Sequence, residues 1–347
     1  MSVVNPDGKK MILTCDGGGI RGLIVTRCLE KLEEIEGDKP CNEIFDFMGG
    51  TSTGAVIVAG LAVGMRAAEL TCFYREECPR VFQPVSFCER LRHKFGWKYE
   101  KTYLRRRLKE ELADVRLEDL PVDIMITAKD TVRGETIFFE KKTFGKMLLR
   151  DAVESSISAP VYFRPNGRYI DGGVGSFNNV CYQAAVEALY YNADRYPAGQ
   201  ARLLSFGTGR GLNNMLEGEA EHKSILDWAF YVIGEGMDDA NDQQVYITRK
   251  EYADQGKLEF RRYQITFTSE IMARIGVKIP EGIDLRNIGI DALEYIDFLD
   301  EVGCRFAEYI DFADPRGCDL RERISLTFDP AYFERLRGRG AYDRRRP

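Results

Sequence analysis

The chain has 347 residues, of which 44% are hydrophobic and 30% are charged, and its formal net charge is −6. This composition is typical of a globular protein with a large core, and it excludes a mostly disordered chain. The longest apolar run, Ala55 to Met65, is far shorter than the ~20 residues of a membrane-spanning helix, and no signal-peptide pattern opens the sequence. We therefore expect a cytoplasmic protein.

The first predicted strand, Lys10 to Cys15, runs directly into a glycine-rich segment, Asp-Gly-Gly-Gly-Ile-Arg-Gly at residues 16–22. A helix follows, because apolar residues recur on one face from Val25 to Ile35 and Gly37 ends the pattern. Glycines at the start of a helix let successive backbone N–H groups point at a negative charge. That charge could be a dinucleotide phosphate, since the segment contains Gly-x-Gly-x-x-Gly, or the oxyanion of an acyl-transfer reaction.

Residues 50–54, Gly-Thr-Ser-Thr-Gly, match the Gly-x-Ser-x-Gly pattern of a nucleophile elbow. A predicted buried strand, Phe45 to Met48, precedes the pattern, and an apolar helix, Ala55 to Gly64, follows it. Small residues on both sides of Ser52 allow the strand to turn sharply into the helix and leave the serine hydroxyl exposed. A five-residue pattern also arises by chance, so an ordinary strand-to-helix turn is the alternative interpretation.

Strands and helices continue to alternate after the elbow. Strands are predicted at 122–128, 136–139 and 202–206, and a helix at 148–158. A third glycine-rich segment, Asp-Gly-Gly at 171–173, precedes the last of these strands. The alternation predicts an α/β fold: a mostly parallel central sheet with helices on both faces, and the three glycine-rich segments grouped at the carboxyl edge where such sheets bind ligands.

The last third of the chain is predicted to add elements to the edge of this sheet. Residues 258–267 alternate, but their apolar parity switches at Arg261-Arg262, which predicts a bulge in a long strand. Apolar residues between Ile290 and Ile310 recur at helical spacing and predict one long amphipathic helix. We therefore predict a single domain over 1–347, with a motif-bearing core at about 10–210, added helices and a strand at 211–335, and an arginine-rich tail at 336–347.

The rest of the sequence decides against a dinucleotide site. A dinucleotide fingerprint has an acidic residue at the end of the second strand, roughly twenty residues after the glycines. Here the nearby acidic residues belong to the end of the helix or to the turn after it: Glu33, Glu34, Glu36 and Asp38. A P-loop is excluded too, because no Gly-Lys-Ser/Thr follows the glycines.

The three glycine-rich segments, in this order, resemble those of the patatin-like phospholipase family. Ser158-Ala-Pro-Val-Tyr-Phe163, just before the third segment, extends the resemblance, which spans about Lys10 to Gly209. The resemblance implies a patatin-like three-layer sandwich related to the α/β-hydrolases. It also implies a lipid acyl hydrolase that cleaves glycerophospholipid esters through an acyl-serine intermediate, without a metal or an organic cofactor.

The resemblance also assigns a role to each motif residue. It makes Ser52 the nucleophile and Asp171 its general base, and it makes the oxyanion hole from the backbone N–H groups of Gly17, Gly18 and Gly19. Arg21 would steady the oxyanion loop. The remaining glycines of the motifs would support the site: Gly50, Gly54, Gly172 and Gly173.

The scarcity of histidine supports a serine–aspartate dyad independently of the resemblance. The chain has two histidines, His93 and His222, and both lie in charged or polar runs that are typical of a solvated surface. A Ser-His-Asp triad would have to use one of them. An aspartate has a reference pKa of ~3.9, so we expect burial to raise the pKa of Asp171 toward the range of a useful base.

One basic segment hints at the surface on which the protein acts. Residues 90–109 hold nine Lys or Arg and one Glu, with four large aromatic residues interleaved. This mixture suits an anionic membrane, although a solvated helix face with core aromatics is the alternative. We expect a phospholipid substrate, peripheral association with the inner membrane face and no nucleic acid polymer as partner.

Two other functions and two partners stay open at this point. The alternatives are a general soluble carboxylesterase and a non-enzymatic nucleotide-binding sensor that uses the loop from Gly17 to Gly22. The family resemblance further suggests a bacterial antiviral effector activated by a cyclic nucleotide, a suggestion to which no residue is attached. A homo-oligomer is left open. The arginines of the C-terminal tail are interpreted as a solubilising end.

Overall fold

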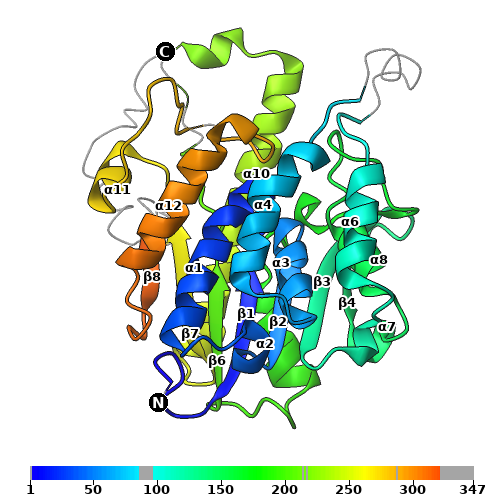
Figure 1. Ribbon diagram of the computed structural model, residues 1–347, viewed down its shortest axis with the longest axis vertical. Helices are drawn as coiled ribbons and strands as arrows, with labels where there is room; N and C mark the ends of the chain where they lie inside the picture. Colours follow the sequence, from blue (N-terminus) through cyan, green and yellow to red (C-terminus); the bar gives the residue numbers. More distant parts are fainter. Residues whose placement is uncertain (1, 86–96, 213–214, 216–217, 287, 321–347) are drawn as a thin grey trace, which may run out of the picture.

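The computed structural model describes residues 2–85, 97–212, 215, 218–286 and 288–320. Within these ranges the strands form one sheet in the order β4-β3-β2-β1-β6-β7-β8, with β5 also paired to β3 (Figure 1). Neighbours from β3 to β8 along this order are parallel, whereas β4 and β5 run antiparallel to β3. The predicted mostly parallel sheet is confirmed. The strands are β1 (Lys10–Cys15), β2 (Phe47–Thr51), β3 (Asp123–Asp130), β4 (Glu135–Glu140), β5 (Tyr169–Asp171), β6 (Ala201–Phe206), β7 (Glu259–Ile265) and β8 (Gly317–Leu320).

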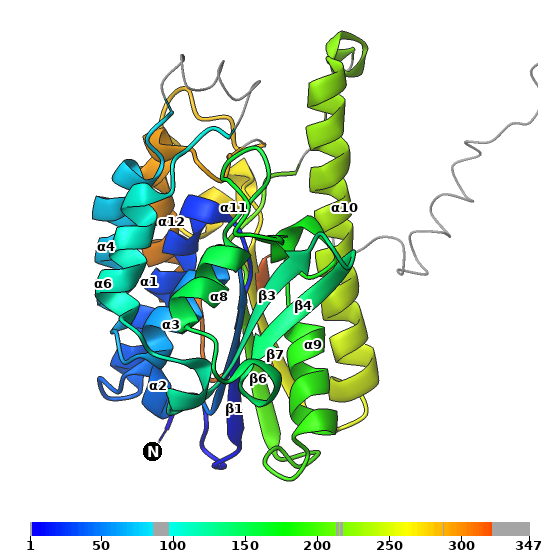
Figure 2. The same cartoon turned by 90° about the vertical axis from the view of Figure 1, so that its right-hand side faces the viewer.

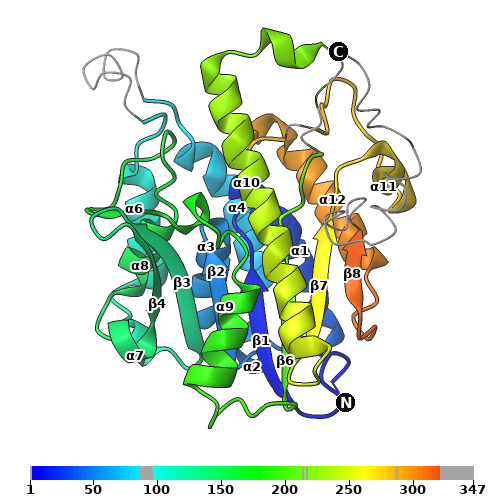
Figure 3. The ribbon, with the colours of Figure 1, turned by 180° about the vertical axis from the view of Figure 1, so that it is seen from behind.

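Helices cover both faces of the sheet, as predicted. Figure 2 shows one thick layer on the face that Figure 1 presents, and Figure 3 shows α9 and α10 on the opposite face. The thick layer contains α1 (Gly22–Ile35), α3 (Thr53–Ala62), α4 (Ala67–Val81), α6 (Thr102–Leu112), α8 (Leu149–Ser156) and α12 (Ile296–Tyr309). The opposite face carries α9 (Cys181–Val186) and α10 (Ile225–Thr248), and the short helices are α2 (Cys41–Ile44), α7 (Lys141–Phe144) and α11 (Ser269–Arg274).

The core has two parts because successive side chains of a strand point to opposite faces of the sheet. In β1, Met11 and Leu13 pack into the cluster under the thick helical layer, and Ile12 packs into the smaller cluster under α9 and α10. All three side chains are buried. This central strand is therefore apolar on both faces, as is typical of parallel sheets covered by helices on each side.

The predicted bulge in β7 is wrong. The pairing of β7 with β6 and with β8 is continuous, and Arg262 lies opposite Ser205 on one side and Gly317 on the other. Both Arg261 and Arg262 are buried, and each has acidic or carbonyl partners. The change of parity in the sequence therefore reflects two buried arginines, each bound to its own acidic or carbonyl partners. Because β7 is buried on both faces, its apolar and polar residues need not alternate.

Two element boundaries differ from their predicted positions, and both differences have local causes. Strand β2 begins at Phe47, because the Asp46 carboxylate accepts the N–H of Met11 at 2.9 Å and holds the preceding turn against β1. Helix α12 begins at Ile296, not near residue 290. The residues before it are occupied elsewhere, since the carbonyl of Ile290 accepts the N–H of Ile20 at 2.9 Å.

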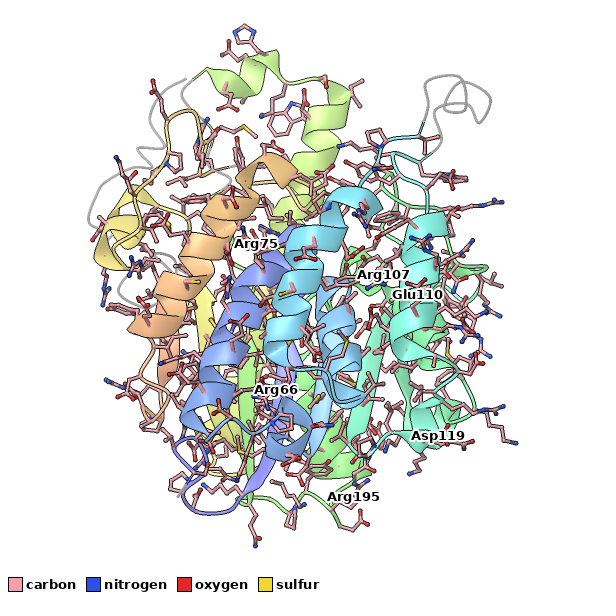
Figure 4. The ribbon with its side chains drawn as sticks, in the orientation of Figure 1. Arg66, Arg75, Arg107, Glu110, Asp119 and Arg195 are labelled. Atoms are coloured by element: carbon pink, nitrogen blue, oxygen red, sulfur yellow. The ribbon has the colours of Figure 1, made fainter. Side chains whose placement is uncertain are left out.

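Ion pairs join the helices of the thick layer across their exposed surfaces. In Figure 4, Arg75 on α4 lies at the boundary with α12, where its guanidinium pairs with Asp297 and Asp300. Among the helices that the structure describes, none combines the length and the apolar character needed to cross a bilayer. The predicted arginine-rich tail at 336–347 and residues 90–96 of the basic segment lie outside the described residues.

Candidate active site

The topology of β3 brings the serine and aspartate motifs together. On one edge of β3, β2 pairs as far as Thr51 opposite Thr127, and β5 pairs from Asp171 opposite Ala128. The other edge is occupied by β4 over the same residues, so β2 and β5 must follow one another along a single edge. The end of β2 and the end of β5 therefore meet, and Ser52, the residue after β2, lies beside Asp171.

Ser52 has the strained backbone of a nucleophile elbow. Its φ of 54° and ψ of −121° lie in a region that L-residues rarely adopt, between the end of β2 and the start of α3. Its N–H donates to Ser156 Oγ at 2.8 Å, a contact that sequence reasoning missed. Glycine is required two residues later, because a Cβ on Gly54 would overlap the carbonyl of Cys15.

The Ser52 hydroxyl donates a hydrogen bond to a buried carboxylate. Ser52 Oγ lies 2.6 Å from Asp171 Oδ2, and the N–H of Gly173 donates to Asp171 Oδ1 at 2.7 Å. Burial raises the pKa of Asp171 to about 6, while the hydrogen bonds from Ser52 and Gly173 and the charge of Lys101 act in the opposite direction. The carboxylate is thus ionised at neutral pH and is a stronger base than an exposed aspartate.

The described residues bring no histidine to this pair. His222 is exposed on a short 3₁₀ helix, Glu219–His222, and His93 lies outside the described residues. Within the described ranges, the hydrogen bonds of the Ser52 and Asp171 side chains involve only each other and the N–H of Gly173. The local chemistry is that of a serine and an aspartate.

Of the three loop N–H groups that the sequence predicts for the oxyanion hole, one is already bound within the described residues and two are not. The N–H of Gly17 donates to the carbonyl of Asn178 at 3.0 Å and is not available to a substrate oxygen. The N–H of Ile20 is similarly bound to Ile290. Among the described residues, the N–H groups of Gly18 and Gly19 have no acceptor.

Three side chains hold this loop, and two of them were not identified from the sequence. Arg21, predicted to steady the loop, donates from Nε to the carbonyl of Gly18 at 3.2 Å. Thr208 Oγ1 donates to the carbonyl of Gly17 at 2.8 Å, and Asn178 Nδ2 reaches the same carbonyl at 3.4 Å. The Gly-Thr-Gly after the strand at 202–206 was the available signal for Thr208.

The loop begins at a buried ion pair with the carboxy-terminal part of the chain. Arg262 Nη1 donates to Asp16 Oδ1 at 2.9 Å and to Ser205 Oγ at 2.8 Å, and Nη2 pairs with Asp16 Oδ2. Both charged side chains are 2% exposed. Burial lowers the pKa of Arg262, but the charge of Asp16 and its hydrogen bonds, together with other nearby acidic groups, raise that pKa above its usual value. The sequence carries no sign of this pairing, because 246 residues separate the partners.

An apolar cavity opens beside Ser52. Ser52 and Gly19 lie on its wall, and the other lining side chains are mainly aliphatic and aromatic. The cavity has a volume of about 60 Å³, well below the roughly 300–1,000 Å³ of typical ligand sites. A long acyl chain would therefore require lining side chains to move. The apolar residues that define the cavity include Val56, Phe73, Val81, Phe82, Leu104 and Phe163.

Two residues of the predicted basic membrane segment, Lys101 and Arg105, instead contact a group of residues that adjoins Asp171. Lys101 is 3% exposed, and its ammonium contacts Ser158 Oγ and lies 3.2 Å from Glu154 Oε1. Arg105 completes the cluster with hydrogen bonds of 2.7 and 2.9 Å to the same carboxylate oxygen. The carbonyl of Ser158 accepts the N–H of Asp171 at 3.1 Å, so this cluster is joined directly to the dyad.

Arg106 and Arg107 of α6 are paired with glutamates of the same helix. Arg107 pairs with Glu110 and Glu111, and Figure 4 shows Arg107 and Glu110 beside one another. Arg106 lies 3.6 Å from Glu110 and over the ring of Tyr103. Much of the positive charge counted in the sequence is therefore balanced locally.

The elbow serine is hydrogen-bonded to a buried aspartate, and two loop N–H groups without acceptors in the described part of the chain belong to the same edge of a mostly parallel sheet. This arrangement is the type of site found in α/β serine hydrolases. Residues 13–183 match the family model described as patatin-like phospholipase. The region at 13–183, about half of the chain, belongs to the patatin-like phospholipase family, as the resemblance of its motifs predicted.

Relatives from animals and plants differ in length and in the activity that their names state. An intracellular phospholipase A2 of Caenorhabditis elegans is 29% identical over 85% of this chain, which spans 29% of that protein. The 85/88 kDa calcium-independent phospholipase A2 of Mus musculus is 30% identical over 57% of this chain, which spans 27% of it. Probable inactive patatin-3-Kuras 1 of Solanum tuberosum is 27% identical, with 62% of this chain and 68% of that protein covered.

A solved structure, VipD from Legionella pneumophila, has a TM-score of 0.40 and 12% identity to this chain, with 85% of this chain and 67% of that chain covered. By contrast with these coverages, this chain spans less than a third of the length of each of the two animal phospholipases.

Proposed function

We propose that this chain is a lipid acyl hydrolase of the phospholipase A type, which cleaves carboxylic ester bonds of membrane glycerophospholipids. The observation that carries the proposal is the 2.6 Å hydrogen bond from Ser52 Oγ to Asp171 Oδ2 at the wall of an apolar cavity. The cavity offers an environment for an acyl chain, and the dyad lies where the ester carbonyl would follow that chain.

The first half of the reaction forms an acyl-serine. Asp171 takes the proton of Ser52 Oγ as the oxygen attacks the ester carbonyl carbon, and the carbonyl oxygen becomes an oxyanion. The N–H groups of Gly18 and Gly19 are the free donors of the loop, and such donors are worth ~3–4 kcal/mol each when aimed at the developing charge. Collapse of the intermediate breaks the bond between the carbonyl carbon and the alcohol oxygen. Asp171 gives its proton to that oxygen, and the alcohol leaves as a lysophospholipid.

The second half releases the fatty acid. Water attacks the acyl-serine carbonyl while Asp171 accepts a proton from it, and the same two N–H groups stabilise the second oxyanion. Collapse returns the proton to Ser52 Oγ and frees the carboxylic acid. Each step uses groups of the chain and water alone, and the buried position of Asp171 keeps its pKa high enough for both proton transfers.

The family assignment does not establish this activity by itself, since one relative carries the word inactive in its name. A fluorophosphonate probe tests it directly: we expect covalent labelling at Ser52 in the wild type and none in Ser52→Ala. Comparison of phospholipids exposed to both proteins should give lysophospholipid and fatty acid with the wild type only. Labelling at another serine would overturn the assignment.

Two alternatives give different results in the same assays. A general carboxylesterase would hydrolyse soluble short-chain esters and leave phospholipid vesicles intact. A nucleotide sensor would bind nucleotide tightly and hydrolyse nothing. The loop offers the sensor few donors, because the N–H groups of Gly17 and Ile20 are already bound within the described residues.

The proposed site of action and regulation concern where the protein meets its substrate and what activates it. We propose a cytoplasmic protein that works at the inner membrane face, on the basis of the sequence alone. Activation by a cyclic nucleotide and a role in antiviral defence rest on the family resemblance alone. Titration of cyclic nucleotides into a phospholipid hydrolysis assay tests the activation, which would raise the rate in the wild type and leave Ser52→Ala inactive.

A further inference from the structure

Helix α10 is longer than the sheet that it crosses. Its 24 residues span about 36 Å at the usual rise of an α-helix, whereas the six residues of β6 span about 20 Å. The helix starts beyond the carboxyl edge of the sheet and ends where the chain turns toward the start of β7. Figures 2 and 3 show its N-terminal turns extending past the body of the protein.

Contacts in the C-terminal half of α10 fix the helix beside the candidate active site. Asp242 pairs with Arg210 at 3.4 Å, and Gln244 Nε2 donates to the carbonyl of Ser176 at 3.1 Å. Ser176 follows the Asp-Gly-Gly motif closely, and Arg210 follows the Gly-Thr-Gly segment at the end of β6. The projecting turns therefore extend from the same edge of the sheet that carries Ser52.

These projecting turns carry large apolar side chains in contact with solvent. Ile225 is 89% exposed, Val232 is 63% exposed and Trp228 is 39% exposed. Trp228 packs edge-on against Tyr231 with their ring centres 5.7 Å apart. Apart from Asp227, every residue from 225 to 233 is apolar or aromatic. Tryptophan and tyrosine favour the boundary between water and lipid because their rings are amphipathic.

The charges around this surface indicate the net charge of the bilayer that it can bind. Glu221 and Asp227 are exposed, and Lys223 is paired with Glu219 at 3.0 Å. From 218 to 234 the sequence holds three acidic residues and one lysine, so this end of the helix is negative. An anionic surface would repel it, whereas a neutral surface would accept its apolar side chains.

We propose that Ile225, Trp228 and Val232 of α10 insert into the headgroup region of an electrically neutral phospholipid bilayer and hold the Ser52 edge of the protein against its substrate. The inference rests on the proposed function, because it takes the bilayer to be the source of substrate. Burial of Ile225, Trp228 and Val232 drives the insertion, and the basic segment around α6 is not required for it.

The chain has two tryptophans, which makes the insertion directly observable. In a Ser52→Ala, Trp97→Phe protein, Trp228 is the only indole and no lipid is hydrolysed. Phosphatidylcholine vesicles should shift its emission to shorter wavelength, as the ring leaves water. Adding Ile225→Ser and Val232→Ser should weaken this binding about tenfold or more, because two aliphatic side chains lose their burial. Vesicles that contain phosphatidylserine should bind no more tightly than phosphatidylcholine alone.

Tyr191→Ser is the matched control, because Tyr191 is 62% exposed and lies before β6 at the opposite edge of the sheet. It should leave vesicle binding unchanged. Binding that is unaffected by the substitutions at 225 and 232, or that requires anionic lipid, would overturn the proposal. So would a lipid-free oligomer that these substitutions convert to a monomer in sedimentation, since the helix would then contact a second copy.

A separate assay distinguishes failure of this inference from failure of the proposed function. With Ser52 intact, hydrolysis of a soluble short-chain ester should be the same with and without the substitutions at 225 and 232, while phospholipid hydrolysis falls about tenfold. If the Trp97→Phe protein with Ser52 intact hydrolyses neither substrate but its Trp228 still responds to vesicles, the proposed function fails and the docking surface stands. If esters are hydrolysed and vesicles produce no shift, the docking surface fails alone.

Discussion

The region that matches the family model, residues 13–183, contrasts with the region after β6, residues 207–320. The first supplies every reacting group of the proposed mechanism, and each belongs to a short motif at the end of a strand. The second supplies none, yet Thr208 and Arg262 hold the oxyanion loop and α10 extends from the same edge. Chemistry is thus encoded locally, whereas support for it comes from residues distant in sequence.

The largest expected effect lies in the first region. Asp171→Asn should lower hydrolysis of a soluble ester about 10³-fold or more, nearly as much as Ser52→Ala, because groups that act as one unit fail together. Steady-state rates of purified proteins provide the measurement. The double change His93→Ala and His222→Ala should retain most of the activity. A comparable loss in that protein, with an unchanged circular dichroism spectrum, would restore a histidine to the mechanism.

A change in the second region tests whether it supports the site or only the fold. Arg262→Met leaves Asp16 buried without its partner, and removing one side of a buried ion pair costs about 3–5 kcal/mol in the free energy of unfolding. We expect kcat to fall as well, because Asp16 begins the oxyanion loop. Denaturant unfolding and kcat on the folded fraction separate the two effects.

Arg261→Met is the matched control, since Arg261 is also buried on β7 but bonds to Glu259 and the carbonyl of Phe312. It should lower stability and leave kcat of the folded protein unchanged. Equal kcat values in the two variants would reduce the role of Arg262 to stability alone, and the contrast between the two regions would weaken.

The pH dependence tests the cluster behind the dyad. Because the base must be unprotonated, kcat/KM on a soluble ester should fall as pH drops through about 6, the pKa to which burial raises Asp171. Lys101→Met removes a positive charge that lowers this pKa, so the midpoint of the acid limb should move to higher pH. Lys101→Arg, which keeps the charge, should return it toward the wild-type position. An unmoved midpoint in Lys101→Met would leave Lys101 a packing role only.

The smallest effect is expected on the outer face of α6. Arg106→Gln should change binding to vesicles that contain phosphatidylserine by less than the ~1 kcal/mol assigned to an unpaired surface charge, because Arg106 already lies near Glu110. Vesicle sedimentation at low and high salt measures it. A strong, salt-dependent loss of binding would return the basic segment to the role that the sequence suggested.

The sequence alone determined the α/β class and the order of the three motifs, and it selected the serine and the aspartate that the structure brings within hydrogen-bonding distance. These features are local. A serine flanked by small residues, between an apolar strand and an apolar helix, predicts a sharp turn because only small neighbours fit there. The count of two histidines likewise predicts a serine–aspartate dyad, which stays a prediction. Short-range pattern was enough wherever the backbone conformation depended on neighbouring residues.

The tertiary structure decided what depends on distant partners. That the N–H of Gly17 is bound to Asn178 while those of Gly18 and Gly19 are free follows from a loop some 160 residues away. The same holds for Arg261 and Arg262, which sequence parity interpreted as a bulge, and for Lys101, which charge counting assigned to a membrane surface. A buried charge looks like a surface charge in a sequence, because its burial is stabilised by partners that only the folded chain brings within hydrogen-bonding distance.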